Sequence, residues 1–197
     1  MSVDPVELVV AAREEARRRS DPHVDVCFLV TAGTGGRPEA RPVSLRDVDG
    51  DGFGLLLNEK SPKWRQIEAG GCSLTIHWSS VGRQYRVYGL LRPMRADRLR
   101  FWWDRKTLGS RLLEHYYDAC KAQSEPVASR EAFLDGIADL GRRYPDAASV
   151  PPPAGLRGVC LWPTSIDVWH SSPSDRLHDR RLFTRNADGW TFETLVP

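Results

Sequence analysis

The sequence predicts an α+β protein whose antiparallel strands form a closed or nearly closed barrel. Segments with the alternation typical of strands lie toward both ends of the chain, whereas amphipathic helical segments are grouped between them. Because strands and helices do not alternate one by one, a parallel α/β sheet is disfavoured. Short turns such as Asp49–Gly52 and Asp188-Gly189 join the strand segments, and they suit antiparallel hairpins.

The first half of the chain is predicted to begin with a helix over about residues 4–19. Asp4 can cap this helix, and Pro5 suits its first turn. The pattern then changes to the alternation of strands, with Val26 and Phe28 on one face. One short helix, which starts at a proline and ends at two glycines, interrupts the strands. The strands are expected at 24–30, 41–46, 53–58, 72–79 and 84–91, and the short helix at about 61–70.

Three helices and four strands are predicted in the second half. Ser129 can cap the third of these helices, and Pro151–Pro153 is an extended connector. We find no internal repeat and no domain linker, so residues 1–197 are treated as a single domain. The helices are expected at 96–106, 109–122 and 129–144, and the strands at 155–162, 164–171, 180–185 and 190–195.

Charge and hydropathy exclude several classes of function. The formal net charge of +2 is too balanced for bulk nucleic-acid binding. No apolar run reaches the ~20 residues that cross a bilayer, and the N-terminus lacks the pattern of a signal peptide. We therefore expect a cytoplasmic protein with no nucleic-acid or membrane partner.

Two groups of residues that attract attention are given structural interpretations. The basic residues of the first helix are interrupted by Glu14 and Glu15, so we interpret them as a solvated face. The four cysteines are not spaced as metal ligands, so we interpret them as separate buried thiols and predict no metal site. The basic residues are Arg13, Arg17, Arg18 and Arg19, and the cysteines are Cys27, Cys72, Cys120 and Cys160.

Three stretches of the chain resemble the pyridoxamine 5′-phosphate oxidase family. The most specific is C-terminal: Ile166-Asp167-Val168-Trp169, then Arg176-Leu177-His178-Asp179-Arg180, then Leu195-Val196-Pro197 at the chain end. Arg41–Arg46 and Arg83–Gly89 are similar to two strands of the family, and the similarity runs from about residue 21 to residue 197. The resemblance implies an FMN-binding split β-barrel with helices grouped on its outside. It also implies a homodimer with FMN at the interface, for which the region of about 155–197 serves dimerisation.

The resemblance also implies which residues hold FMN. A phosphate dianion needs fixed cations and hydrogen-bond donors, and Arg41, Ser61 and Lys63 match the family's phosphate positions. In this chain Pro62 stands between that serine and lysine, where the family has arginine. Polar groups at the ring edge would tune the flavin. The matching positions there are Gln84, Gln123, Ser124, Trp169 and Arg180, and further cofactor contacts fall at Pro42, Val43, Ser44, Leu56 and Leu57, the last two standing where the family shows Tyr-Thr.

Arg176 and His178 match the family's substrate-contacting, catalytic pair. On a strand, residues two apart point the same way, so both side chains are expected to face one pocket. Histidine also exchanges protons readily near neutral pH. The positions that match the family's set for the substrate phosphate are Arg46, Trp102, Lys106 and Ser110, with Arg105 as the alternative to Lys106.

Three functions remain open on the sequence. The first is oxidation of pyridoxine or pyridoxamine 5′-phosphate, a phosphorylated B6 vitamer, to pyridoxal 5′-phosphate, with O2 as acceptor and H2O2 as product. The second is oxidation of another small dihydroaromatic ring by a flavin oxidase of the phenazine-biosynthesis type. The third is a flavin-binding split barrel without enzymatic activity. The retained Arg176 and His178 disfavour the third, whereas the altered phosphate set keeps the second open.

Overall fold

The computed structural model describes residues 3–197, which form two compact units. The first unit contains the chain up to Leu55 together with Gly70–Arg92 and Cys160–Pro197, and the second contains Leu56–Ala69 and Pro93–Val159. Each unit is described by itself below. The assignment of the chain to a single domain stays a prediction.

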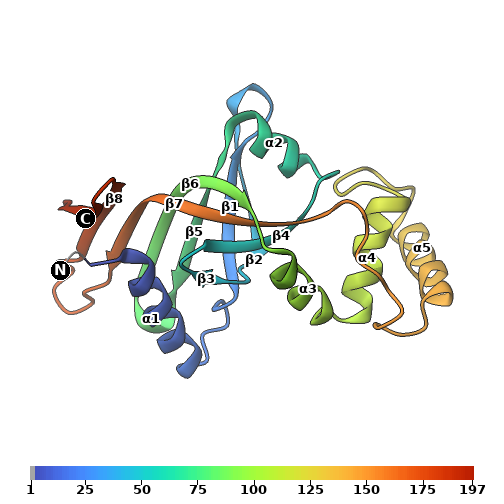
Figure 1. Cartoon of the computed structure of the whole chain (residues 1–197), viewed down its shortest axis with the longest axis horizontal. Coiled ribbons are helices and arrows are strands. Elements are labelled where there is room, and N and C mark those ends of the chain that lie inside the picture. Colours follow the sequence, from blue (N-terminus) through green and yellow to red (C-terminus); the bar gives the residue numbers. More distant parts are fainter. Residues whose placement is uncertain (1–2) are drawn as a thin grey trace. The chain divides into compact units, whose positions relative to one another are not determined.

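The strands form one curled sheet in the order β2-β1-β5-β6-β7-β4-β3, and β8 and β9 extend it from β7 (Figure 1). The β1–β2, β1–β5, β5–β6 and β7–β8 pairs are antiparallel. This curled antiparallel sheet corresponds to the closed or nearly closed antiparallel barrel that the sequence predicted. The strands are β1 (Val26–Ala32), β2 (Pro38–Ser44), β3 (Val48–Asp49), β4 (Gly52–Asn58), β5 (Cys72–Trp78), β6 (Arg83–Pro93), β7 (Leu156–His170), β8 (Asp179–Asn186) and β9 (Gly189–Thr194).

The helices follow the predicted capping signals closely. The side chain of Asp4 accepts a hydrogen bond from Val6 N at the start of α1, and Ser129 accepts one from Ala132 N at the start of α5. None of the helices within residues 3–197 is long and apolar enough to cross a membrane. The helices are α1 (Pro5–Arg18), α2 (Pro62–Gly70), α3 (Ala96–Asp104), α4 (Leu108–Ala119) and α5 (Arg130–Arg143), with single 3-10 turns η1 (Thr34–Gly36) and η2 (Ser79–Val81).

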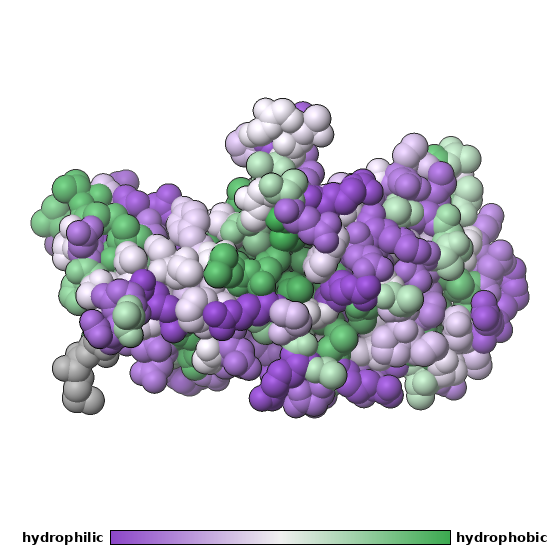
Figure 2. Space-filling view, turned by 45° about the horizontal axis from the view of Figure 1, so that its top comes forward, coloured by the Kyte–Doolittle hydropathy of each residue, from purple (hydrophilic) through white to green (hydrophobic). Residues whose placement is uncertain are grey.

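The alternating apolar residues of β1 lie on the solvent-accessible side of the sheet. Cys27 and Leu29 are buried, whereas Phe28 between them is 44% exposed. Phe28 is directly opposite Pro42 on β2 and Thr75 on β5. Side chains directly opposite each other share a face, so these residues define a surface that we call the exposed sheet face. Figure 2 shows apolar side chains at the foot of the β1–β2 hairpin and over β8 and β9.

β7 is one continuous strand, so the predicted break at Pro163 is wrong. β7 pairs with β8 only from Ser165 onward, and a side chain on Gly52 of β4 would meet the Leu161 carbonyl oxygen at 2.3 Å. Pro163 therefore lies where the strand next to β7 changes from β4 to β8. Proline has no backbone N–H to donate, and its absence is tolerated at such a point. Its carbonyl oxygen accepts a hydrogen bond of 3.1 Å from Arg185 Nε.

Arg13 is buried, so its interpretation as part of a solvated basic face is wrong. Its guanidinium donates to the carbonyl oxygens of Val24, Leu45 and Arg46 and to the carboxylate of Asp25. Burial lowers the pKa of Arg13, and the Asp25 carboxylate opposes that shift. The residue thus fastens α1 to the segments that flank β1 and β2. Arg17, Arg18 and Arg19 do lie at the surface, where they pair with Glu14, Glu15 and Asp25.

The cysteines are free thiols, as predicted, but not all are buried. Cys27 and Cys160 are buried, Cys72 is half-buried and Cys120 is exposed. Burial raises the pKa of Cys27 to about 12 and that of Cys72 to about 11. Cys120 follows the last turn of α4, where a cysteine at the helix end does not reach the core.

The second unit has its own apolar core. Trp103 of α3 is fully buried, and its indole N–H donates to the Val150 carbonyl oxygen at 3.1 Å. Leu112 of α4 and Leu156 at the start of β7 complete the buried cluster. The side chains packed against it are Leu56, Leu99, Leu108, Ile137, Leu140 and Tyr144.

Candidate active site

Several of the predicted flavin-ring residues share the exposed sheet face of the first unit. Thr75 on β5 lies between Phe28 and Arg86, so Arg86 of β6 is on this face, and Gln84 two residues earlier is on it too. On β7 and β8, Trp169 is directly opposite Arg180. Pro42 and Ser44 belong to the same face through their pairing with Phe28 and Val26. Gln84, Arg86, Trp169 and Arg180 therefore come from three neighbouring strands.

A buried carboxylate holds two arginines at this face. Arg180 makes a two-pronged contact with Asp167, with Nε to Oδ1 at 3.1 Å and Nη2 to Oδ2 at 2.8 Å. Nη2 of Arg86 lies 2.8 Å from the same Oδ2. The hydrogen bonds that Arg180 donates to the Asp167 carboxylate raise the pKa of Arg180. Because Asp167 is buried and one carboxylate cannot balance two guanidinium groups, this part of the face keeps a net positive charge.

Sequence reasoning did not assign a role to Asp167 or Arg86. The positions of both residues in the sequence could have indicated a role. Asp167 belongs to the C-terminal block that carries the resemblance, two residues before Trp169 and hence on the same face. Arg86 is two residues after Gln84 on the same strand. An arginine and an aspartate that lie on the same face of neighbouring strands are expected to pair.

Arg41 and Val43 lie on the opposite face from Pro42 and Ser44. Nη1 of Arg41 donates to the Thr31 hydroxyl at 2.6 Å and to the Leu29 carbonyl oxygen at 3.2 Å. Nη2 pairs with Glu39 at 2.9 Å. The guanidinium is therefore held in place along β1 and β2, rather than extended into solvent.

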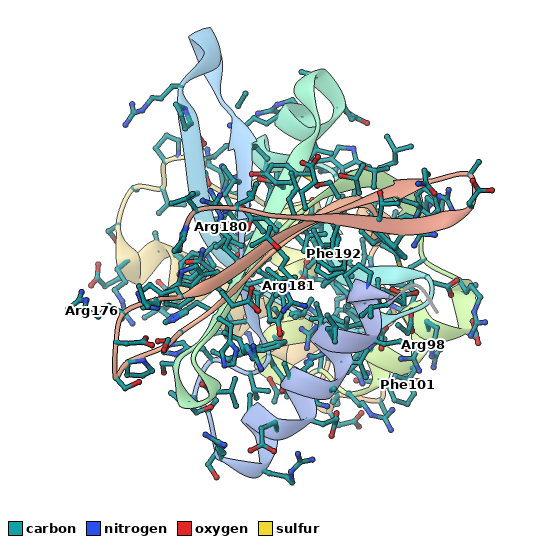
Figure 3. The ribbon with its side chains drawn as sticks, turned by 90° about the vertical axis from the view of Figure 1, so that its left-hand side faces the viewer. Arg98, Phe101, Arg176, Arg180, Arg181 and Phe192 are labelled. Atoms are coloured by element: carbon teal, nitrogen blue, oxygen red, sulfur yellow. The ribbon has the colours of Figure 1, made fainter. Side chains whose placement is uncertain are left out.

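Arg176 and His178 lie in the loop between β7 and β8, so the premise that they belong to a strand is wrong. Arg176 has a φ of 61°, and β8 begins only at Asp179. A left-handed residue turns the chain, and the two side chains diverge. Figure 3 shows Arg176 pointing away from the sheet, whereas Arg180 lies on β8. His178 instead packs on Trp169, with ring centroids 4.6 Å apart.

The tautomer of His178 is fixed by a backbone hydrogen bond. Ser172 N donates to His178 Nδ1 at 3.0 Å. An N–H can donate only to an unprotonated nitrogen, so Nδ1 is the acceptor and the proton of the neutral ring is on Nε2. Nε2 is therefore the nitrogen of this ring that can donate to a bound molecule.

In the second unit, Lys63 and Gln123 are brought together by a hydrogen bond between Lys63 Nζ and Gln123 Oε1. Ser124 follows in a left-handed turn, with a φ of 71°. Ser61 is fully buried, and both its N–H and its hydroxyl donate to the Asn58 carbonyl oxygen. Those donors close the turn before α2, so Lys63 is the charged residue of the two that were matched to the phosphate here.

Leu56 and Leu57 at the end of β4 are apolar for a structural reason. Leu57 is buried, and Leu56 packs against the core cluster of the second unit. Residues that fill a core in this way cannot be exchanged for polar ones without leaving unpaired groups. Any cofactor contact from this segment would come from the backbone.

The residues predicted for the substrate phosphate are held by other partners. Nζ of Lys106 lies 2.5 Å from Glu114 Oε1, and both side chains are largely buried. Arg105 is exposed, with its guanidinium 3.5 Å from the centre of the Phe101 ring. Trp102 packs edge-on against the same ring, and Ser110 N donates to the capping hydroxyl of Thr107. Arg46, in the first unit, is half-buried after β2.

The curled antiparallel sheet, together with arginine, glutamine and tryptophan gathered on one face of it, defines a split-barrel protein of the flavin-oxidase type. Residues 14–141 match the pyridoxamine 5′-phosphate oxidase family, and residues 157–197 match the pyridoxine 5′-phosphate oxidase C-terminal dimerisation region. The chain belongs to the pyridoxamine 5′-phosphate oxidase family, and it is an enzyme of that oxidase type.

Relatives and solved structures agree with this assignment. A pyridoxine/pyridoxamine 5′-phosphate oxidase from Hyphomonas neptunium is 33% identical over 98% of this chain and 87% of its own length. PhzG from Burkholderia lata, in complex with tetrahydrophenazine-1-carboxylic acid, superimposes with a TM-score of 0.82 at 24% identity, covering 100% of this chain and 94% of PhzG. An FMN-binding protein related to pyridoxamine 5′-phosphate oxidase, from Nostoc punctiforme, gives 0.73 at 19% identity and covers both chains fully. These structures confirm the predicted α+β split-barrel fold.

Proposed function

We propose that the protein is an FMN-dependent oxidase that converts pyridoxine or pyridoxamine 5′-phosphate to pyridoxal 5′-phosphate, with O2 as acceptor and H2O2 as product. With the amine substrate, water supplies the carbonyl oxygen and ammonia is released. The observation that carries this proposal is the Arg176–Arg180 motif. In it, Arg180 is anchored on Asp167 and His178 is packed on Trp169, in a chain 33% identical to an enzyme of that name. We place the reaction in the cytoplasm.

The residues present fit FMN by the chemistry of their donors. Arg41 and Lys63 supply two cations for the phosphate, and Gln84, Trp169 and Arg180 supply a polar and aromatic surface for the ring. The positive charge left beside Asp167 suits a group that gains negative charge on reduction. When bound, the flavin supplies a two-electron acceptor. Pro42, Val43, Ser44, Leu56, Leu57, Ser61, Gln123 and Ser124 complete the proposed cofactor set.

The chain's own residues would orient the substrate through a hydrogen-bond donor and a cation. His178 presents Nε2–H as a donor because Ser172 holds Nδ1. A donor fixed in this way can orient a hydroxyl or phenolate oxygen of the substrate. Arg176, exposed in the loop between β7 and β8, supplies a cation that can pair with a bound anion. Arg46, Trp102, Lys106 and Ser110 are the proposed remaining substrate contacts.

One observation favours a second candidate, the oxidation of an unphosphorylated ring. Lys106 is already neutralised by Glu114 within a largely buried pair. Using Lys106 for a substrate phosphate requires that pair to break, which costs free energy because Glu114 is then left without its partner. Trp102, four residues before Lys106, offers an apolar ring where the family has a phenol. A flat ring without a phosphate would avoid this cost.

The two candidate functions differ in how much the substrate phosphate contributes to kcat/KM. Charge-assisted hydrogen bonds contribute about 1.5–3 kcal/mol each, so losing one lowers kcat/KM about ten- to a hundredfold. If the substrate is a B6 phosphate, Arg46→Ala is expected to raise KM for pyridoxine 5′-phosphate by that factor. The wild type should also strongly prefer pyridoxine 5′-phosphate to pyridoxine. The measurement is pyridoxal 5′-phosphate and H2O2 formation with saturating FMN.

The matched control is Arg37→Ala, which removes an exposed arginine at the tip of the β1–β2 hairpin and should leave kcat/KM unchanged. Equal rates of the wild type on pyridoxine and its phosphate would overturn the B6 assignment. Turnover of a dihydroaromatic acid under the same conditions would then support the second candidate.

We also propose that the protein is a homodimer, as the match to a dimerisation region suggests. The exposed sheet face carries Phe28 and Tyr88, each 44% exposed, and Leu90, 61% exposed. Apolar side chains of this size gathered on one sheet face are typical of a self-complementary interface. Gln84, Trp169 and Arg180 lie on the same face, so the interface and the flavin site would coincide.

Phe28→Glu is expected to dissociate the dimer and to release FMN, because it places a charge among the apolar side chains of this face. Sedimentation velocity at micromolar concentration measures the first effect, and flavin fluorescence measures the second. Leu134→Glu is the control, since Leu134 is 43% exposed but belongs to α5 of the second unit rather than to the sheet. A wild-type monomer that holds FMN stably would contradict the proposal.

A further inference from the structure

A cavity in the first unit lies apart from every residue assigned to the flavin or the substrate. It has a volume of about 420 Å³ and lies between α1 and the strands β6 and β7. In Figure 1, α1 lies beside the ends of these strands. The lining residues are Leu8, Ala11, Ala12, Glu15 and Arg19 of α1 and its C-terminal cap, Val81 of η2, Arg83 and Tyr85 of β6, and Val168 and His170 of β7.

This cavity is on the opposite side of the sheet from the candidate active site. Arg83 and Tyr85 flank Gln84 on β6, and Val168 and His170 flank Trp169 on β7. Successive side chains of a strand point to opposite faces, so the cavity-lining residues point away from the exposed sheet face. A molecule in the cavity would therefore not compete directly with the flavin.

Two basic side chains, Arg83 and His170, line the cavity. Within residues 3–197, the side chains of Arg83 and His170 make no hydrogen bond and no ion pair. Burial lowers the pKa of His170, the positive charge of Arg83 lowers it further, and the Asp179 carboxylate opposes the shift. Two basic groups that repel each other in a partly closed cavity are stabilised by a bound anion.

The other charged groups near the cavity are already paired. Glu15 accepts from Arg19 Nε at 2.7 Å and also pairs with Arg18. Nη1 of Arg19 donates to the Ser80 carbonyl oxygen. Asp179, directly opposite His170 on β8, holds Arg181 at 2.9 Å. Asp179 acts on His170 through space, but none of these carboxylates forms an ion pair with Arg83 or His170.

The remaining walls are apolar and small. Leu8, Ala11 and Ala12 form one wall, and Val81 and Val168 contribute to the other. Tyr85 adds an aromatic ring, and burial raises its pKa to about 12, so its hydroxyl stays protonated and can donate. A pocket with apolar walls and a few convergent polar groups is the usual form of a small-molecule site, and 420 Å³ is of the right size.

We propose that this cavity binds a small aromatic anion, a flat apolar ring that carries one carboxylate or phosphate group. The anionic group would lie between Arg83 and His170, and the ring would lie against Tyr85 and the alanines of α1. Because α1 forms one wall, a bound molecule would also stabilise the docking of that helix.

The test is a titration of the dimer, saturated with FMN, with phenyl phosphate, benzoate and inorganic phosphate. Calorimetry gives the affinity, and NMR of the His170 ring, assigned with His170→Gln, gives its pKa. One phenyl phosphate or benzoate per chain is expected to bind and to raise the pKa of His170. Arg83→Gln is expected to weaken binding about tenfold or more, because a charge-assisted hydrogen bond is lost.

Two further variants make the result specific to this cavity. Ala12→Phe fills the cavity without changing a charge and is expected to prevent binding. Arg37→Gln, which removes an exposed arginine elsewhere, is expected to leave binding unchanged. Affinity unaffected by Arg83→Gln, or a pKa of His170 that does not move, would overturn the proposal. Inorganic phosphate binding as tightly as phenyl phosphate would overturn the aromatic site. No readout depends on turnover, so the outcome is independent of the proposed oxidase reaction.

Discussion

Replacing Arg13 by alanine is expected to lower the free energy of unfolding by about 3 kcal/mol or more. The guanidinium satisfies the carbonyl oxygens of Val24, Leu45 and Arg46 and the carboxylate of Asp25. Each buried acceptor left without a donor costs about 1–3 kcal/mol, and Arg13 is itself buried, so water cannot take its place freely. Urea denaturation followed by circular dichroism, at one fixed protein concentration, measures the loss.

The matched control for this variant is Arg18→Ala. Arg18 is on the same helix, but it is exposed and its partner in an ion pair is Glu15. Exposed pairs of this kind contribute about 0–1 kcal/mol, so the control should be close to the wild type. An equally small effect for Arg13→Ala would mean that α1 is not fastened through this residue.

Arg180→Ala is expected to weaken FMN binding about ten- to a hundredfold, because one charge-assisted contact with the flavin is lost. Asp167 remains buried with only Arg86 as an ion-pair partner, so the negative charge of the carboxylate would act on the flavin directly. By contrast, Arg176→Ala and His178→Ala are expected to lower turnover and to leave FMN bound. Fluorescence titration with FMN and steady-state kinetics separate the two effects.

Arg181→Ala is the matched control for Arg180→Ala. The two residues are neighbours on β8, but Arg181 pairs with Asp179 and its side chain is on the other face (Figure 3). It should bind FMN like the wild type. Equal loss of FMN in the variants of Arg176, His178 and Arg180 would mean that the motif is structural, and the catalytic assignment would be withdrawn.

Local signals in the sequence were sufficient for most elements. Asp4 and Ser129 cap their helices as predicted because a cap depends only on residues two or three positions away. The Asp188-Gly189 turn forms for the same reason, with a φ of 120° at the glycine.

The errors have a common cause, which is dependence on distant parts of the chain. Pro163 is accepted inside β7 only because the neighbouring strand changes there. Alternation showed that Phe28 shares a face with Val26, but not that Cys27 and Leu29 fill the core instead. The burial of Arg13 depends on carbonyl groups more than ten residues away.

The sequence predicted which residues belong to the candidate site, but not how their side chains are positioned or paired. The resemblance supplied Gln84, Trp169 and Arg180, and the register of the sheet brings them to one face. It did not supply the buried Asp167, which fixes Arg180, or Glu114, which neutralises Lys106. Charge compensation of this kind is decided by side-chain geometry, which sequence spacing does not specify.

The place of β7 in the sheet has a consequence for biosynthesis. β7, at Leu156–His170, lies between β6 and β4, both of which end before residue 94. During translation, the inner edges of β4 and β6 therefore remain unpaired until at least 60 more residues have left the ribosome. Open strand edges are templates for pairing with other chains. A nascent chain of this protein thus passes through a long interval in which aggregation competes with completion of the sheet, and chaperone binding in that interval would protect it.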